Sequence, residues 1–387
     1  MESETKLDFS DPFILSEDMY VTDPILNKTN TFSYTAYTLQ GKKIPEPLIR
    51  RYRDFAALRV KLVENWPGFF IPNIPHKQII GSKNNEIIEM RIELINRFCT
   101  QISKIDYLFN SEEMNIFLTN TTDVIKLFNN CKTKSYNELL KKYSEIITNY
   151  DDNFDIENSK KEQEKFYKLI KENYPRIKSF KQLIINSRDK YKNIHDNYTS
   201  IINILSLYEK ETLKDYCNND ENKLIFYNSK NENLLNNIEK IRQSSNNPYD
   251  RLLDSISEDY LYTEAMIESF DSLKELNEKL NKLKKKFLSL NADLVSLQSG
   301  NKIKNKEEIM NNLSTQKNNL ENEINDLEKI IKIVTFNMND QIKKFKTHSL
   351  NYYYKELLKL EEDTDKFGKD LENLWESTLD NDNIKQL

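Results

Sequence analysis

The chain has 387 residues, which is enough for two or three domains or for one domain with an elongated element. Its 57 basic and 62 acidic residues give a net charge of −5, which argues against a general nucleic-acid binder and makes any basic function local. Three scattered cysteines and three scattered histidines argue against a structural zinc site and indicate a reducing compartment. Without a signal peptide or an apolar run of spanning length, the sequence predicts a soluble cytoplasmic protein.

Proline and glycine divide the chain into two unequal parts. Seven of the nine prolines and three of the five glycines precede residue 82. These residues interrupt helices and strands, and their scarcity further on permits long helices. The sequence therefore predicts a compact mixed domain over about the first 120 residues, followed by a helical rod.

The first part carries patterns for three strands and then for helices. Around residue 34, Phe32, Tyr34 and Ala36 alternate with more polar neighbours, which predicts a strand with one buried face. Two weaker strands are expected at Phe13–Val21 and Leu48–Arg51. The remaining patterns predict helices over Asp54–Asn65, Glu86–Ile105 and Glu112–Thr119. Strands followed by helices indicate a small α+β domain with a three-stranded antiparallel sheet.

The second part has the apolar spacing of long packed helices. Apolar residues recur at intervals of three and four over Leu252–Leu297 and again over Ile309–Phe345. Repeats of this length are typical of coiled-coil packing. The segment Ser299–Asn301 between them, with Gly300 at its centre, predicts the turn of an antiparallel hairpin. An earlier stretch of about residues 156–242, interrupted near Asn218, supplies a third helix.

Positive charge gathers at one point in the first part, in the stretch Ile49-Arg-Arg-Tyr-Arg-Asp-Phe55. An arginine can bind a phosphate through two hydrogen bonds, and a neighbouring tyrosine ring can pack on a sugar-like face. Lys77 and Arg91 follow downstream. We therefore expect these separated cations and the aromatic ring to converge on a phosphorylated ring.

These motifs resemble those of the PX (phox-homology) domain over about residues 10–120. The resemblance rests on Arg-Arg-Tyr-x-x-Phe, on apolar-Pro-x-x-Pro-x-Lys at residues 71–77, and on the helical Arg91. It implies binding of phosphatidylinositol 3-phosphate. Arg51 would hold the 3-phosphate, Tyr52 would stack under the inositol ring, Lys77 would meet the 1-phosphate, and Arg91 would bond the 4- and 5-hydroxyls.

Other residues near these motifs have simpler expected roles. Arg50 and Arg53 are expected to be accessory or solvated, and Phe55 is expected in the core. Ile79 and Ile80 follow the lysine in a loop and allow two interpretations. They either pack beneath the loop or insert into the bilayer beside the headgroup, as the corresponding loop does in PX relatives.

The helical part, Asp123 to Leu379, resembles the BAR domain of the sorting nexins. Phe345-Lys-x-x-x-Leu350 and Leu371-x-x-x-Trp375 resemble the last helix of that family. The resemblance implies that three long helices form a curved dimeric coiled-coil bundle, which senses or shapes curved membranes. The alternative is an endosomal coiled-coil tether or adaptor that binds phosphoinositide without remodelling the membrane.

Two further segments carry membrane-binding patterns. Val124, Leu127 and Phe128 share one helix face beside lysines, as in an interfacial amphipathic helix, although a linker helix docked on its neighbours would have the same pattern. The basic residues of the hairpin turn lie where a BAR arm would meet anionic lipid. They are Lys302, Lys304 and Lys306.

The resemblance also implies a cellular role and a set of partners. We expect a peripheral protein of early endosome membranes that acts in protein sorting and retrograde transport, with autophagy-related trafficking also open. It would form a homodimer, or a heterodimer with another sorting nexin, and meet retromer-like or cargo proteins, without nucleic acid or cofactor. The sequence has no Gly-rich phosphate loop, G-x-S-x-G or H-E-x-x-H, so no enzyme is expected.

The expected domain boundaries follow from these patterns. The PX domain spans residues 13–120, the amphipathic linker helix 121–150 and the BAR domain 151–380. Short tails are expected at residues 1–12 and 381–387.

Overall fold

The computed structural model describes most of the chain. The described residues are 16–28, 33–74, 85–131, 134–147, 150, 154–216, 224, 226, 235–241, 247–299 and 306–379. They divide into two compact units. Unit 1 combines Met1–Glu172 with Leu261–Lys344, and unit 2 combines Asn173–Tyr260 with Phe345–Leu387. These units group the residues differently from the expected domain boundaries, which stay a prediction.

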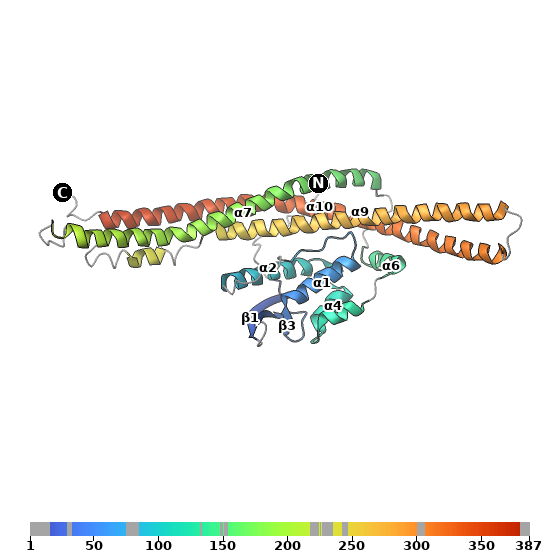
Figure 1. The fold of residues 1–387 in the computed structure, drawn as a ribbon, viewed down its shortest axis with the longest axis horizontal. Helices are drawn as coiled ribbons and strands as arrows, with labels where there is room; N and C mark the ends of the chain where they lie inside the picture. Colours follow the sequence, from blue (N-terminus) through green and yellow to red (C-terminus); the bar gives the residue numbers. More distant parts are fainter. Residues whose placement is uncertain are drawn as a thin grey trace, which may run out of the picture. The chain divides into compact units, whose positions relative to one another are not determined.

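Unit 1 contains a three-stranded antiparallel sheet, as the sequence predicted (Figure 1). The strands lie in the order β1 (Tyr20–Lys28), β2 (Ser33–Gln40) and β3 (Leu48–Arg51). The first strand was expected earlier, at Phe13–Val21. Residues 13–15 of that range lie outside the described residues, and β1 begins at Tyr20 and runs on past Asp23 and Pro24. The structure accommodates these strand-breaking residues in an irregularity between Thr22 and Ile25, where the β1–β2 register shifts.

The core face of β2 differs in part from the predicted one. The alternation pointed to Phe32, Tyr34 and Ala36 as the buried set. Ala36 is fully buried, and Phe32 lies outside the described residues, but the large core side chains of this strand are Tyr37 and Leu39. Tyr34 is only half-buried. Because side chains alternate across a strand, Tyr34 projects from the opposite face.

Six shorter helices, α1 to α6, follow the sheet within the described residues of unit 1. The predicted helices appear with small changes at their ends, and two short helices replace the single linker helix. Their bounds are α1 (Tyr52–Asn65), α2 (Asn85–Ser103), α3 (Asp106–Phe109), α4 (Glu112–Thr119), α5 (Val124–Asn130) and α6 (Tyr136–Ile146). Ser111 and Ser135 start α4 and α6 by accepting hydrogen bonds from the backbone of Met114 and Glu138.

Three long helices make up most of the remaining described chain, in agreement with the prediction (Figure 1). They are α7 (Ile156–Tyr208), α9 (Tyr249–Ser299) and α10 (Lys306–Leu379). A short π-helical turn, Glu209–Leu213, continues α7. The end of α9 at Ser299 agrees with the predicted hairpin, whereas Gly300 and the expected interruption near Asn218 lie outside the described residues. Dimerisation and curvature stay predictions.

The helices of unit 1 share one hydrophobic core with the small domain. The core cluster joins Phe55, Trp66 and Phe98 of the small domain to Leu327 and Val334 of α10. Phe69 and Phe70 are buried, as expected. The ring of Phe70 also lies 4.5 Å from that of Tyr262 in α9, measured between centroids. The sheet-containing domain is therefore packed directly on the long helices within this unit.

Polar contacts set the alignment of α7 against α10 in unit 1. The buried Gln163 side chain donates to the Thr335 carbonyl at 2.7 Å and to Asn339 Oδ1 at 2.6 Å. Asn339 Nδ2 in turn donates to Ser159 Oγ at 2.9 Å. Because buried polar groups must be paired, this network favours one longitudinal register.

Unit 2 has smaller apolar clusters of its own. One contains Ile184, Leu252, Leu253 and Ile256, and another contains Ile202, Ile238 and Leu374. The Tyr174 and Tyr260 rings stack with centroids 5.0 Å apart, and their hydroxyls are hydrogen-bonded at 2.7 Å.

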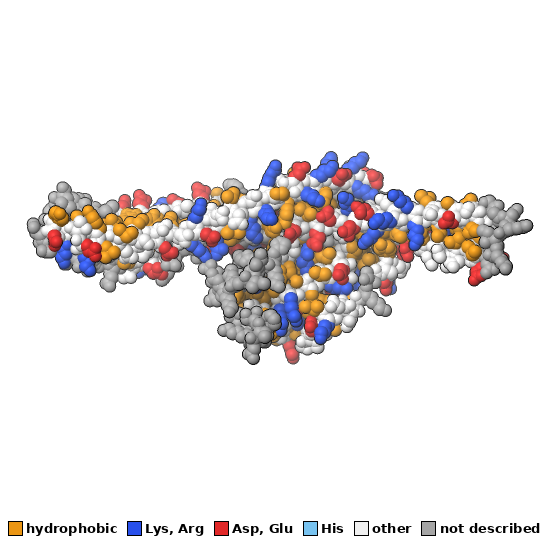
Figure 2. All heavy atoms as spheres, viewed as in Figure 1, with side chains coloured by type: hydrophobic (Ala, Val, Ile, Leu, Met, Phe, Trp, Pro, Cys, Tyr) orange, Lys and Arg blue, Asp and Glu red, His pale blue; other side chains and the backbone are white. Residues whose placement is uncertain are grey.

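On the face shown in Figure 2, Lys and Arg side chains are interspersed with Asp and Glu.

Candidate phosphoinositide-binding site

Arg51 lies at the junction between β3 and α1. It is the last residue of the strand and the N-cap of the helix, with an extended backbone at φ −98° and ψ 160°. Its backbone N–H donates to Asp54 Oδ2 at 2.8 Å. Its guanidinium carbon lies 3.5 Å from the centroid of the Tyr34 ring. The helix start therefore fixes the backbone of Arg51, and Tyr34 contacts its charged group.

The two neighbouring arginines have different surroundings. Arg50 is 2% exposed, and its Nη2 donates to the Phe117 carbonyl at 2.7 Å and to the Asn120 carbonyl. The expectation of an accessory or solvated Arg50 is therefore wrong, because Arg50 ties β3 to the end of α4. Burial lowers the pKa of Arg50, and the Asp54 carboxylate opposes this effect. Arg53 is exposed, as expected, with Nε 3.5 Å from Asp54 Oδ1.

Tyr52 and Arg91 lie close together. Tyr52 is the first residue of α1, and the Arg91 guanidinium carbon lies 5.8 Å from the centre of its ring. Burial raises the pKa of Tyr52, and the charges of Arg91 and Arg59 partly offset this effect. Burial also raises the pKa of Tyr37, which Arg91 again opposes. Both phenols are therefore neutral at neutral pH, and the charge of Arg91 acts on both of them.

The structure describes only part of the predicted site. Lys77, Ile79 and Ile80 lie outside the described residues. The segment that leads to them is described as far as Ile74, and Arg59 Nε donates to the Pro72 carbonyl there at 3.0 Å. This contact of Arg59 with the segment before Lys77 was not revealed by the sequence motifs.

The basic side chains expected at the hairpin tip are likewise not described by the structure. Lys302 and Lys304 lie outside the described residues. Lys306 opens α10, but its side chain lies outside the described set.

The proposed amphipathic face of the linker is packed inside unit 1. Val124 and Phe128 are 2% and 3% exposed and belong to the core cluster, and Leu127 is half-buried. In this arrangement α5 is a docked linker helix, which was the alternative interpretation. A membrane role for Val124, Leu127 and Phe128 stays a prediction that requires α5 to leave this position.

A buried charge pair joins the linker to the small domain. Lys142 Nζ of α6 lies 3.8 Å from Glu113 Oε1 of α4 and 3.7 Å from the Trp66 ring centre. Burial lowers the pKa of Lys142 to about 8, although Glu113 opposes this shift. Burial also acts to raise the pKa of Glu113, but Lys142 and the Asn65 amide outweigh it and lower that pKa. No local pattern in the sequence indicated this pair, because its two members are 29 positions apart along the chain.

Two further features concern metals and membranes. Within the described residues, no group of three or more His, Cys, Asp or Glu side chains is arranged to hold a metal ion. None of the helices in the same part of the chain combines the length and apolar composition needed to cross a bilayer.

The small domain matches a known family. Residues 42–121 match the PX domain. The chain is 35% identical over 107 residues to "Sorting nexin 1" of Arabidopsis thaliana. This match covers 25% of this chain and 27% of that protein. It is 34% identical over 106 residues to "Vacuolar protein sorting-associated protein vps5" of Schizosaccharomyces pombe, which covers 25% of this chain and 18% of that protein. These matches span about a quarter or less of the length of the relatives.

The fold of the whole chain also has a solved counterpart. It resembles a chain in the cryo-EM structure of the SNX-BAR Mvp1 tetramer with a TM-score of 0.52 and 15% sequence identity. The likeness covers 94% of this chain and 100% of that chain. The fold and the family match define a PX-domain protein with a long helical region. In architecture, the chain is similar to the sorting nexins: it combines a PX domain with a long helical region, and its fold resembles that of an SNX-BAR protein.

Proposed function

We propose that this protein binds phosphatidylinositol 3-phosphate on early endosome membranes and, as a dimer of its BAR-like helices, senses or shapes curved membrane during protein sorting and retrograde transport. The PX domain supports phosphoinositide binding, and the sorting-nexin relatives support the trafficking role. The partner helix would come from a second copy or from another sorting nexin, and retromer-like or cargo proteins would join the assembly.

The observation that carries the lipid-binding proposal is the set of contacts made by the Arg51 guanidinium. Of the three clustered arginines, Arg50 is committed to backbone carbonyls and Arg53 to Asp54, whereas Arg51 contacts an aromatic face. A phosphate needs N–H groups that are not already used, and a stacked guanidinium leaves its N–H edges for such a ligand. Arg51 is thus the arginine suited to the 3-phosphate, with Tyr52 next to it in the chain and Arg91 near the Tyr52 ring.

The dimer proposal is supported by apolar side chains that unit 2 leaves uncovered. Leu183, Ile201, Ile204 and Leu207 of α7 are all exposed. Several apolar residues on one helix are typical of a surface that another subunit covers. In the proposed BAR-like dimer, the long helices of two chains pack together and cover these side chains.

Sedimentation with liposomes tests the lipid assignment. We expect the full chain to bind vesicles that contain phosphatidylinositol 3-phosphate and to bind vesicles with the 4-phosphate isomer or with no phosphoinositide much less. Arg51→Ala should lose this binding, because a charge-assisted phosphate contact is worth several kcal/mol. Arg53→Ala is the matched control and should bind as the wild type does. Equal binding by Arg51→Ala and the wild type would exclude this site.

Electron microscopy of the same liposomes tests the remodelling role. Tubules at high protein coverage are the expected result for a BAR dimer. Bound but spherical vesicles would instead support the phosphoinositide-binding tether.

A further inference from the structure

We propose that Tyr34 is a positioning residue for phosphate binding: its ring supports the Arg51 guanidinium and aims its N–H edges at a phosphorylated headgroup. This inference rests on the proposed function, because it assigns a role within the same site. The motifs of the sequence did not include Tyr34, and its β2 position was expected to face the core.

The short distance between the two groups defines how they pack. The Arg51 guanidinium carbon lies 3.5 Å from the centre of the Tyr34 ring, which is the contact distance of two carbon atoms. A guanidinium that pointed its N–H groups into the ring would hold its carbon further away. The two planes are therefore stacked face to face. In such a stack all the N–H bonds of the guanidinium point sideways, away from the ring.

The pairing of the strands explains why the two residues meet. Arg51 of β3 is directly opposite Ala36 of β2, and Tyr34 lies two positions before Ala36 on the same face. Diagonal neighbours across two strands are within reach of long and aromatic side chains. The small side chain of Ala36 leaves Arg51 free to lean over Tyr34. The sheet register, and not a loop, therefore positions the contact.

The charged neighbours leave this arrangement undisturbed. The Asp54 carboxylate accepts from the Arg51 backbone N–H and lies 3.5 Å from Arg53 Nε. Within the described part of the chain, no carboxylate forms an ion pair with the Arg51 side chain. The aromatic face therefore orients the guanidinium without occupying a hydrogen-bond donor, as a carboxylate would. This leaves the donors for a phosphate.

The ring should contribute modestly to affinity. A cation–π contact at a partly exposed position is worth about 0.5 to 1 kcal/mol, which corresponds to about a two- to sixfold change in a dissociation constant. Tyr34→Leu removes the aromatic face and keeps an apolar side chain, so it should weaken binding by this factor. Tyr34→Phe keeps the face and should bind within about twofold of the wild type. Tyr20→Leu is the matched control, a half-buried tyrosine of the same sheet outside the Arg51 contact.

The experiment is isothermal titration of the full-length variants with short-chain phosphatidylinositol 3-phosphate, with inositol 1,3-bisphosphate and inorganic phosphate as separate arms. Unchanged thermal midpoints will show that the variants are folded. We expect Tyr34→Leu to be weakened, and Tyr34→Phe and Tyr20→Leu to match the wild type. The effect of Tyr34→Leu should shrink in an Arg51→Lys background, because an ammonium has no plane to align.

The outcomes separate the inference from the proposed function. Equal affinities of Tyr34→Leu and wild type, with loss of binding by Arg51→Ala, would overturn the role of Tyr34 and leave the lipid site standing. The same holds if Tyr34→Phe is as weak as Tyr34→Leu, or if the effect of Tyr34→Leu persists unchanged with Lys at position 51. If the wild type binds none of the three ligands, the proposed function itself fails. Binding of inorganic phosphate as tight as that of the lipid would identify a general phosphate site and not a lipid headgroup site.

Discussion

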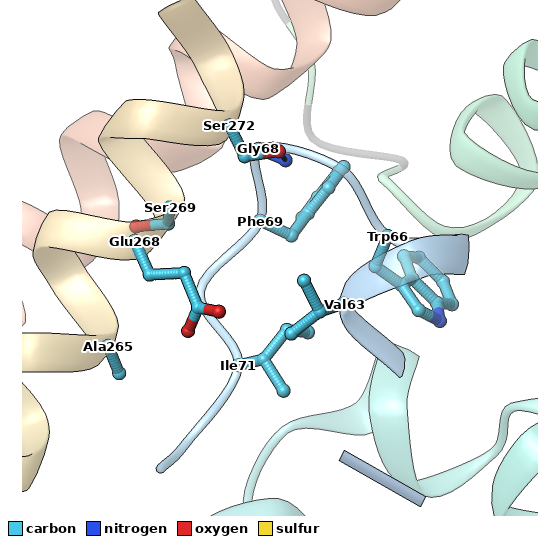
Figure 3. Close-up of a pocket in the computed structure, with 9 residues that line it drawn as sticks. All are labelled: Val63, Trp66, Gly68, Phe69, Ile71, Ala265, Glu268, Ser269 and Ser272. Atoms are coloured by element: carbon cyan, nitrogen blue, oxygen red, sulfur yellow. Dashed lines mark hydrogen bonds between the residues drawn. The ribbon is translucent and has the colours of Figure 1, made fainter. Parts of the chain in front are cut away.

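The backbone N–H of Gly68 donates to Ser272 Oγ at 2.9 Å, which ties the turn after α1 to helix α9 (Figure 3). Gly68 has a positive φ of 84°, a conformation that side chains disfavour. A Cβ atom added there would lie 2.6 Å from Val334 Cγ1 of α10. Figure 3 shows the pocket beside this contact, which has a volume of about 10 Å³. It holds no more than about one water, so the turn and the helices meet closely.

Gly68→Ala should destabilise the protein. Strain at positive φ and overpacking against Val334 each cost about 1 to 3 kcal/mol, so the midpoint of thermal unfolding should fall by several degrees. Gly368→Ala is the control, since Gly368 lies in α10 and nothing would contact the added Cβ within 4 Å. Alanine favours helix by about 1 kcal/mol over glycine, so this variant should be at least as stable as the wild type. A neutral Gly68→Ala would show that the turn can move away from α10.

Charge reversal should test the second link between α1 and α9. Arg59 Nη2 pairs with Glu268, and Arg59 Nε holds the Pro72 carbonyl. Arg59→Glu and Glu268→Arg should each lower the free energy of unfolding by about 1 kcal/mol or more, because each places like charges together. The double variant should recover part of the loss. Urea denaturation gives the free energy of unfolding of the wild type, the two single variants and the double variant. If the loss in the double variant equals the sum of the two single losses, the pair does not interact.

The Lys142–Glu113 pair should make the free energy of unfolding depend on pH in the alkaline range. The pKa of Lys142 in the folded protein is about 8, below its ordinary value of 10.5. Between these values the unfolded chain binds more protons, so the contribution of Lys142 to the free energy of unfolding should increase as pH rises from 8 towards 10.5. Urea denaturation at pH 7, 8, 9 and 10 measures the trend. Lys142→Gln should remove this component, whereas replacing the exposed Lys141 should leave it in place; identical trends in all three proteins would contradict the assignment.

The exposed apolar residues of α7 should hold the dimer. The full chain should sediment as a dimer or a larger assembly at micromolar concentration. Ile204→Glu and Leu183→Glu should shift it towards monomer, because a buried unpaired charge in an interface costs several kcal/mol. Leu288→Glu in α9, an exposed apolar position of unit 1, is the control. A wild type that is monomeric at this concentration would contradict the proposed dimer.

Local signals in the sequence determined the types and positions of most elements. The scarcity of proline and glycine after residue 122 and the three-four spacing of apolar residues predicted the long helices. The helix at Glu112–Thr119 and the strand at Leu48–Arg51 have the predicted bounds, because caps and periodicity act over a few residues. The arginine and proline motifs led to the PX domain for the same reason. Each of these signals is contained in a short stretch of chain.

Tertiary contacts decided what local patterns leave open. Arg50 is buried because the Phe117 carbonyl, 67 residues away in sequence, accepts its hydrogen bond, while the adjacent Arg51 turns to Tyr34. The core face of β2 depended on which side the helices cover, and alternation alone is compatible with either side. Likewise, the amphipathic pattern that includes Val124 and Phe128 would be the same for a helix on a membrane and for a helix packed on a protein core. Only the packing of α5 in unit 1 places them in the core, because the hydrophobic effect favours any apolar surroundings without specifying which.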